Sequence, residues 1–289
     1  MKKKNFILIV FCLPAFLLYF TFVLYPAIGG FWYSLTNWNG LNPTYAYVGF
    51  SNYRELLGDE NFKNSILFTT KYVIYMVVLQ NLLAFVLAVI IESLSKGRKL
   101  LRTIFFFPNM ISMIIGGFIW MFVFSRVFPY LVDNYGIMFL DQSWIGDPNF
   151  SFYSILILSL WGSVGYLMII YIAALQSIPG SLIEAAQIDG ANKLQILWSV
   201  IRPLMLNSIT IGIFISLSSS FKVFDQVYAL TGGGPGRATQ VVSLNIFMEA
   251  FAMQSRYGYA SAKAVILFVI ILLITGVQLF AMKRKEVEM

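Results

Sequence analysis

The sequence predicts an all-α integral membrane protein with six transmembrane helices. Of its 289 residues, 59% are hydrophobic and only 11% are charged, whereas a typical soluble domain has about 25% charged residues. Six intervals are long enough and apolar enough to cross a bilayer, which takes roughly 20 mostly apolar residues. We therefore expect a single membrane domain covering residues 1–289.

The spans are predicted from intervals that lack charged residues, at about residues 6–25, 72–91, 103–125, 152–176, 203–221 and 264–282. Charged residues bound several of them, as Arg102 and Arg126 bound the third. The first interval follows three lysines, as a signal peptide would. However, it is too long for a typical signal-peptide core, and no clear small-x-small cleavage site follows it. We expect it to remain as a span.

The basic residues predict the topology. Most of the 20 lysines and arginines stand in short clusters that alternate spans would place on one side, at residues 2–4, 96–102, 193, 202 and 283–285. Most of the acidic residues fall in the other segments. Cytoplasmic segments carry an excess of Lys and Arg, so we expect both termini and the segment between spans four and five to be cytoplasmic. These clusters also account for the net charge of +7 without a nucleic-acid partner.

The residue types argue against an enzyme. The chain has no His and one Cys, Cys12, which excludes an intrachain disulfide and argues against a zinc or haem site. The glycine-rich stretch at residues 231–236 lacks the Gly-Lys-Ser/Thr ending and the strand-to-helix context of a P-loop. Without His, and with most carboxylates in loops, we find no catalytic constellation. We expect a non-catalytic chain.

A comparatively polar segment separates spans four and five. Pro179 suits the first turn of a helix that Ser177 or Ile178 would cap, Glu184 falls early in that helix, and Gly190 permits a turn. Apolar residues then recur at i, i+3, i+4 and i+7, which is typical of an amphipathic second helix: Leu194, Leu197, Trp198 and Ile201. The pattern alone fits a simple connector as well as a docking site.

The spacing of this segment resembles the EAA loop of binding-protein-dependent ABC importer permeases. Glu-Ala-Ala is followed by three residues, a glycine, nine residues, an aliphatic residue, two further residues and a proline. Val200 stands where that family usually has Ile, and Arg202 stands where it usually has Leu. The resemblance implies a cytoplasmic helix that couples to an ATPase through Glu184, Ala185, Ala186, Asp189, Gly190, Ala191 and Pro203.

Further stretches resemble the sugar-importer permeases of the MalF type, at residues 13–26, 34–38, 48–53, 221–225 and 230–235. The implied assembly has two related permease subunits, two cytoplasmic ATPase subunits that bind ATP and Mg²⁺, and an external solute-binding protein. This chain would hold no cofactor and would lie in the bacterial cytoplasmic membrane. The sequence does not identify the sugar, so mono-, di- and oligosaccharides and glycerol phosphate stay open.

The substrate pathway is predicted from polar side chains within the spans, which are costly in a bilayer unless they face a cavity or another helix. Hydroxyl groups and an aromatic ring suit a sugar, so the candidate residues are Ser159, Ser163 and Tyr166 in span four and Ser216, Ser219 and Ser220 in span five. Small polar residues also line ordinary helix–helix contacts, so a packing role stays open for these residues. The same two alternatives apply to Gln80, Asn81 and Asn109.

An ion-coupled secondary transporter or channel is the competing class. It predicts buried acidic residues in the spans or inverted repeats between the two halves. The six predicted spans contain no Asp or Glu, and we find no clear internal repeat. The sequence therefore favours the importer permease.

Overall fold

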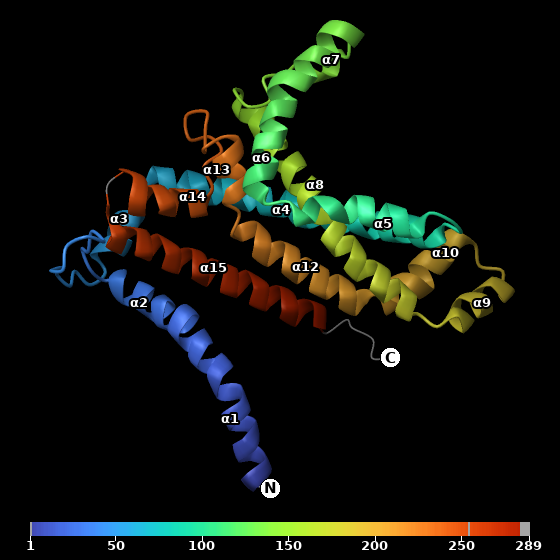
Figure 1. Ribbon diagram of the computed structural model, residues 1–289, viewed down its shortest axis with the longest axis horizontal. Helices are drawn as coiled ribbons and strands as arrows, with labels where there is room; N and C mark the ends of the chain where they lie inside the picture. Colours follow the sequence, from blue (N-terminus) through green and yellow to red (C-terminus); the bar gives the residue numbers. More distant parts are fainter. Residues whose placement is uncertain (1, 254, 284–289) are drawn as a thin grey trace. The chain divides into compact units, whose positions relative to one another are not determined.

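A computed structural model describes residues 2–253 and 255–283 (Figure 1). Arg284 and Lys285, which contribute to the topology prediction, lie outside the described residues. The described chain is helical apart from its loops and one isolated bridge between Thr36 and Tyr47. Five helices are long and apolar enough to cross a membrane, and a bent pair of helices makes a sixth candidate. This agrees with the all-α prediction.

The chain divides into two compact units, Met1–Phe62 with Asn245–Ile270 and Lys63–Leu244 with Ile271–Met289. The single domain expected from the sequence stays a prediction. The elements before the second unit are α1 (Lys2–Tyr19), η1 (Phe20–Leu24), α2 (Tyr25–Tyr33) and α3 (Ser51–Leu56). The last helix, α15 (Tyr257–Lys283), begins in the first unit.

The remaining helices lie wholly or mostly in the second unit: α4 (Glu60–Ser93), α5 (Arg98–Phe106), η2 (Phe107–Met110), α6 (Met113–Phe122), η3 (Val123–Val127), α7 (Phe128–Tyr135), η4 (Met138–Leu140), α8 (Pro148–Ser177), α9 (Gly180–Ile188), α10 (Lys193–Ile196), η5 (Leu197–Ile201), α11 (Arg202–Leu204), α12 (Leu206–Phe221) and α13 (Asp225–Leu230). Two short elements, α14 (Val242–Phe247) and η6 (Met248–Met253), follow the glycine-rich loop.

In the first unit, the loop after α2 is held by one buried side chain. The Asn52 amide donates to the carbonyl oxygens of Ser34 at 2.8 Å and Thr36 at 2.9 Å. At Gly258, near the start of α15, a Cβ atom would lie 2.1 Å from the Thr36 carbonyl oxygen. Glycine at this position therefore lets the loop pack directly against the backbone of α15.

The core of the second unit lies between α4 and α8. Ala84 and Ala88 on α4 are fully buried and belong to one hydrophobic cluster with large buried residues of α8, such as Leu167 and Met168. Small residues on one helix allow close approach of the other, which is how membrane helices gain packing contacts. Burial is greatest in α8, where 61% of the most apolar stretch is buried.

The predicted third span is not one continuous helix. Residues 103–125 begin in α5 and pass through η2, where Pro108 lacks an N–H to continue the ladder. Ile111 and Ser112 have extended backbones before α6 begins at Met113. The apolar helical stretch then runs from Met113 to Tyr135, so Arg126, expected at its end, lies within it.

The predicted fifth span is part of a bent pair of helical stretches. Lys193–Leu204 and Leu206–Phe221 meet at 71°. Pro203 stands two residues before the break at Met205, and a proline removes a hydrogen bond from the helix, which makes a sharp bend possible. The bend thus separates the polar segment from the apolar helix α12.

Candidate functional site

The polar segment between spans four and five forms two helices joined by a tight turn. After α9, Gly190 adopts a left-handed backbone with φ of +81°, which glycine does without a steric cost. The Gly190 N–H donates to the Gln187 carbonyl oxygen at 3.0 Å, and the Ala191 N–H donates to that of Ala186 at 2.9 Å. This pair of bonds is a Schellman motif, which explains the glycine in physical terms.

The prediction that Ser177 or Ile178 caps the start of α9 is wrong. Helix α8 continues to Ser177, whose hydroxyl donates to the Ala174 carbonyl oxygen at 2.7 Å. Ile178 is extended because the residue before a proline is disfavoured in the helical region. Pro179 is also extended and holds the cap position, so α9 begins at Gly180.

The second helix begins with a capping box that we did not identify in the sequence, although the Asn-x-x-Gln spacing would have indicated it. The Asn192 side chain accepts from the Gln195 N–H at 2.9 Å, and the Gln195 side chain accepts from the Asn192 N–H at 2.8 Å. Of the predicted apolar face, Leu194 and Trp198 are exposed, whereas Ile196, outside that pattern, is buried.

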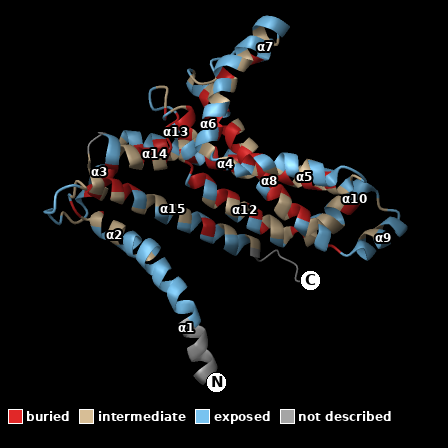
Figure 2. Ribbon diagram, viewed as in Figure 1, coloured by how far each residue is buried: buried red, intermediate tan, exposed pale blue. Residues whose placement is uncertain are grey.

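Helix α9 is exposed on nearly its whole surface, as its pale blue and tan ribbon in Figure 2 shows. None of its residues is buried, and the apolar side chain of Ile188 is 87% exposed. Of the predicted coupling residues, Glu184, Ala185, Asp189 and Gly190 are exposed, whereas Ala186, Ala191 and Pro203 are half-buried.

The two ends of this segment are fixed in the core of the second unit. Ile178 precedes α9, and Met205 follows α11; both are buried among residues of α4 and α8. A tight turn and a capping box hold the helices between these ends. The arrangement presents a short, stiff helix to the solvent and attaches it to the packed core at both sides, so a displacement of α9 would reach that core.

The predicted pathway residues of α8 differ in accessibility. Ser159 is buried, and its hydroxyl donates to the Ile155 carbonyl oxygen at 2.7 Å. The half-buried Ser163 donates to the Ser159 carbonyl oxygen at 2.6 Å. Tyr166 is 43% exposed. The aromatic ring is therefore accessible in this chain, while the two serine hydroxyls are bonded to their own helix.

The three predicted serines of α12 also differ from one another. Ser216 is fully buried and donates to the Gly212 carbonyl oxygen at 2.7 Å. Ser219 is exposed and donates to the Ser216 carbonyl oxygen at 3.1 Å. The buried Ser220 hydroxyl has no hydrogen-bond partner within the described part of the chain.

A polar network that the sequence did not reveal joins three helices. Asn81 of α4 donates to the Ser216 hydroxyl of α12 at 2.7 Å and accepts from the Tyr171 hydroxyl of α8. A Cβ atom at Gly212 would lie 2.2 Å from the Tyr171 oxygen, so this glycine makes room for the tyrosine. Asn81, beside Gln80 in an otherwise apolar run, was visible in the sequence, but its partners were not.

Gln80 and Asn109 bind the backbone of α8 instead. The Gln80 amide donates to the Ser163 carbonyl oxygen at 3.3 Å, and the Asn109 amide donates to that of Gly162 at 3.2 Å. Both side chains therefore tie neighbouring helices to α8.

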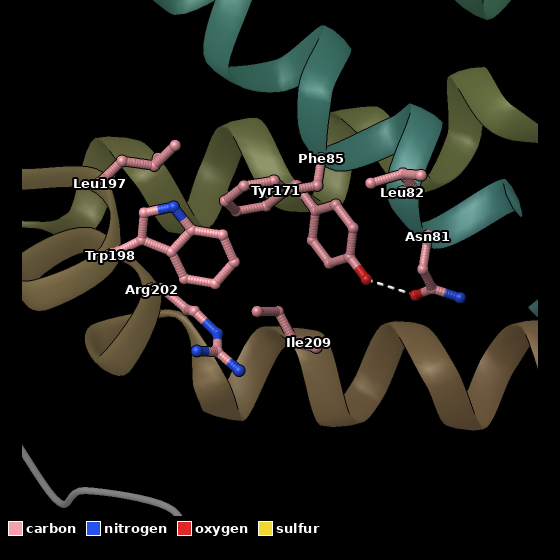
Figure 3. A pocket seen from close by; sticks show the side chains of 8 residues that line it. All are labelled: Asn81, Leu82, Phe85, Tyr171, Leu197, Trp198, Arg202 and Ile209. Atoms are coloured by element: carbon pink, nitrogen blue, oxygen red, sulfur yellow. Dashed lines mark hydrogen bonds between the residues drawn. The ribbon is translucent and has the colours of Figure 1, made fainter. Parts of the chain in front are cut away.

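A cavity of about 200 Å³ lies beside the Asn81 network (Figure 3). Its walls are almost entirely apolar, and the two polar atoms at one side, the Tyr171 hydroxyl and the Asn81 carbonyl oxygen, bond to each other. The lining residues are Asn81, Leu82, Phe85, Tyr171, Leu197, Trp198, Arg202 and Ile209. These walls suit an apolar group rather than a sugar, which needs hydrogen-bond partners.

Long apolar helices and an exposed helical segment anchored in the core define a multi-pass helical membrane protein. More specifically, the chain belongs to the family of binding-protein-dependent transport system inner membrane components, which matches residues 80–286. It is thus a non-catalytic membrane subunit of a transport system.

The chain is similar along nearly its whole length to permease proteins. It is 41% identical to the probable starch degradation products transport system permease AmyD of Thermoanaerobacterium thermosulfurigenes, covering 97% of this chain and 95% of the relative. It is 35% identical to the multiple sugar-binding transport system permease MsmF of Streptococcus mutans, covering 96% and 95%. It is 32% identical to the trehalose/maltose permease MalF of Thermococcus litoralis, covering 92% and 90%.

The fold is shared with a chain of a bacterial ABC transporter involved in the import of the acidic polysaccharide alginate. The TM-score is 0.84, and the alignment covers 98% of this chain and 96% of that one at 24% identity. At this identity the likeness establishes the fold alone.

Proposed function

We propose that the chain is a permease subunit of an ATP-driven carbohydrate importer and forms half of its translocation pathway. The observation that carries the proposal is the full-length similarity to permeases named for starch products, multiple sugars and trehalose/maltose. The other half would come from a second, related permease. An external solute-binding protein would deliver the sugar, and two ATPase subunits would bind ATP and Mg²⁺.

In this proposal α9 lies in the cytoplasm, as do both termini, and docks into a cleft of one ATPase subunit. Its exposure and its outward apolar residues, Leu182 and Ile188, support such a contact. Glu184, Ala185, Ala186 and Asp189 would lie in or beside the docked helix, with Gly190 and Ala191 closing its turn. Pro203 would stand at the return to the membrane.

Transport would follow from displacement of α9 by the ATPase pair. Closure of the two ATPase subunits on ATP would move the docked helix. Its buried ends at Ile178 and Met205 would carry that movement into the α4–α8 core and favour one of two access states.

The sugar would pass along the α8 and α12 residues proposed above. Tyr166 offers an accessible ring, Ser219 an exposed hydroxyl and Ser220 an unbonded one within the described chain. Ser159, Ser163 and Ser216 already donate to their own helices, so they would contribute mainly their small size and their remaining acceptor capacity.

Site-directed cross-linking tests the coupling contact. In a Cys12→Ser background, Ala185→Cys carries a thiol-linked photo-reactive group on the exposed side of α9, and Tyr135→Cys serves as the control at an exposed position on the predicted outer side. We expect capture of the ATPase from membranes of the assembled transporter at position 185 only. Equal capture at both positions, or transport by the purified chain alone in vesicles without ATP, would contradict the proposal.

A further inference from the structure

The apolar cavity in the second unit is not used by the proposed sugar pathway. Its wall includes the apolar side chains of Leu82 and Phe85 of α4, Leu197 of η5 and Ile209 of α12. A buried water needs two to four polar partners, and the Asn81 carbonyl oxygen is already bonded to Tyr171. A volume of about 200 Å³ would hold several waters, but the mostly apolar walls offer too few polar groups to give each of them two to four hydrogen bonds. The cavity is therefore suited to a hydrocarbon chain.

A cation stands at the same cavity. The Arg202 guanidinium carbon lies 4.8 Å from the centre of the Trp198 ring, and both side chains line the cavity (Figure 3). Arg202 is exposed and has no carboxylate partner in the described part of the chain. A guanidinium group is well suited to bind a phosphate through two hydrogen bonds.

The position of this cation fits a membrane–water boundary. Arg202 and Trp198 lie one helical turn apart, just before the 71° bend that leads into the apolar helix α12. Arg and Trp are typical of that boundary because each combines an apolar body with a polar end. Basic pockets between membrane helices on the cytoplasmic side are known to favour anionic lipid head groups.

We propose that this cavity binds an anionic phospholipid, with its phosphate on Arg202 and part of an acyl chain against Leu82, Phe85 and Ile209. The apolar walls select an amphiphile over a free phosphate, and the guanidinium selects an anionic head group over a zwitterionic one. The inference rests on the proposed membrane placement of Arg202 and not on the coupling role of α9.

Fluorescence quenching by brominated lipids tests this site. The assembled transporter is placed in phosphatidylcholine nanodiscs that contain brominated-chain phosphatidylglycerol or brominated-chain phosphatidylcholine, and the Trp198 signal is obtained by difference from Trp198→Phe. We expect brominated phosphatidylglycerol to quench Trp198 at a mole fraction roughly fivefold lower than brominated phosphatidylcholine does. A roughly fivefold preference is what the attraction of one interfacial cation to an anionic head group corresponds to. Arg202→Gln should abolish this preference, whereas Lys222→Gln, an exposed cation at the other end of α12, should preserve it.

A second variant tests the acyl chain. Ile209→Phe narrows the cavity while it keeps Arg202, so quenching by both lipids should fall. Equal quenching of the native transporter by the two lipids would overturn the proposal. Absence of quenching by either lipid would also overturn the proposal, since another protein surface and not a lipid would then fill the cavity. Displacement of the brominated lipid by inorganic phosphate alone would also overturn it, because the acyl chain of the lipid would then contribute nothing to binding. None of these results alters the cross-linking outcome at position 185.

Discussion

The least expected residue of the first unit is Lys263, whose side chain is 1% exposed. Its ammonium nitrogen lies 2.9 Å from carboxylate oxygens of both Asp59 and Glu249 and donates to the Asn245 side chain at 2.9 Å. A charge can remain buried only when such partners replace its water. Lys263 therefore ties three segments of the first unit together.

Removal of this charge should be strongly destabilising. Lys263→Met leaves two carboxylates without their buried partner, and breaking such a pair costs about 3–5 kcal/mol. Thermal unfolding of the purified chain measures the loss. Arg98→Met is the control, because the Arg98 side chain is 44% exposed and lies 3.9 Å from its partner Glu92, and an exposed ion pair of this kind contributes about 0–1 kcal/mol. Equal losses for the two variants would show that Lys263 is not a buried charge.

The ionisation of Asp59 makes the stability of the fold depend on pH. Burial alone would raise the pKa of Asp59, but hydrogen bonds from Lys263, the Phe62 N–H and Tyr259 outweigh it and hold that pKa below its ordinary value. The ionised form therefore stabilises the fold. This contribution is complete above about pH 4, the ordinary pKa, and is lost as the pH falls through the lower pKa of the folded state.

We accordingly expect Asp59→Asn to lower the unfolding temperature at pH 7. As the pH falls below about 4, the unfolding temperatures of the variant and of the native protein should converge. Unfolding curves across that range measure the difference. Asp189→Asn, a change of an exposed carboxylate on the turn after α9, should show no such convergence. A difference for Asp59→Asn that did not change with pH would mean that its charge does not contribute.

At the scale of the helices, the apolar intervals were readable from the sequence because hydropathy and length are local properties. The breaks were not. Pro108 was visible, but it stands in an uncharged and mostly apolar interval, and the extended Ile111 and Ser112 show that the helix stops there. Similarly, Pro203 was visible in the sequence, but the 71° bend at the buried Met205 was not.

The polar network could not be predicted for a related reason. The sequence shows Asn81 as one of two adjacent amides in a span, but its partners Tyr171 and Ser216 stand 90 and 135 positions later. The burial of Lys263 likewise depends on Asp59 and Glu249, which the sequence leaves unconnected to it. In contrast, the two helices and the turn between spans four and five could be predicted, because the turn and the spacing of Glu184, Gly190 and Pro203 are local features. Their coupling role stays a proposal.

The Asn81 network should behave as a unit that joins α4, α8 and α12. Asn81→Ala should cost about 1 kcal/mol, in the range measured for hydrogen bonds between membrane helices, and Tyr171→Phe should cost less. The double variant should cost less than the sum, because both changes remove the same bond. Ser219→Ala, which changes an exposed serine of α12, is the control. Additive losses would show that the two residues act independently. Unfolding in increasing detergent denaturant measures all four variants.

At the scale of the whole molecule, burial is uneven. The most apolar stretch of α8 is 61% buried, whereas that of the first long helix, within Phe11–Tyr33, has no buried residue. The first helix therefore leaves its apolar surface to lipid or to another subunit. An exposed α9 and an exposed first helix are the features expected of a chain that works within a larger assembly.

The turn after α9 gives a test of coupling in the assembly. Gly190 and Gly97 both have φ of +81°, and a Cβ atom at either would meet no atom within 4 Å. A side chain in this conformation costs roughly 1–2 kcal/mol at either position. Gly190→Val should abolish the stimulation of ATP hydrolysis by the sugar-loaded binding protein, whereas Gly97→Val should retain it. Comparable loss in both variants, with normal membrane insertion, would argue against a special role for the α9 turn.

The first unit is built from Met1–Phe62 and Asn245–Ile270, which are far apart in the chain. Glu55 is synthesised 201 residues before Arg256, its ion-pair partner, and Asp59 similarly precedes Lys263. At about 5–20 residues per second, the ribosome needs roughly 10–40 s to cover such a separation. During that interval the early carboxylates must remain hydrated or be shielded by other proteins. The unit that contains the start of the chain is therefore completed late in biogenesis, after the second unit has largely been made.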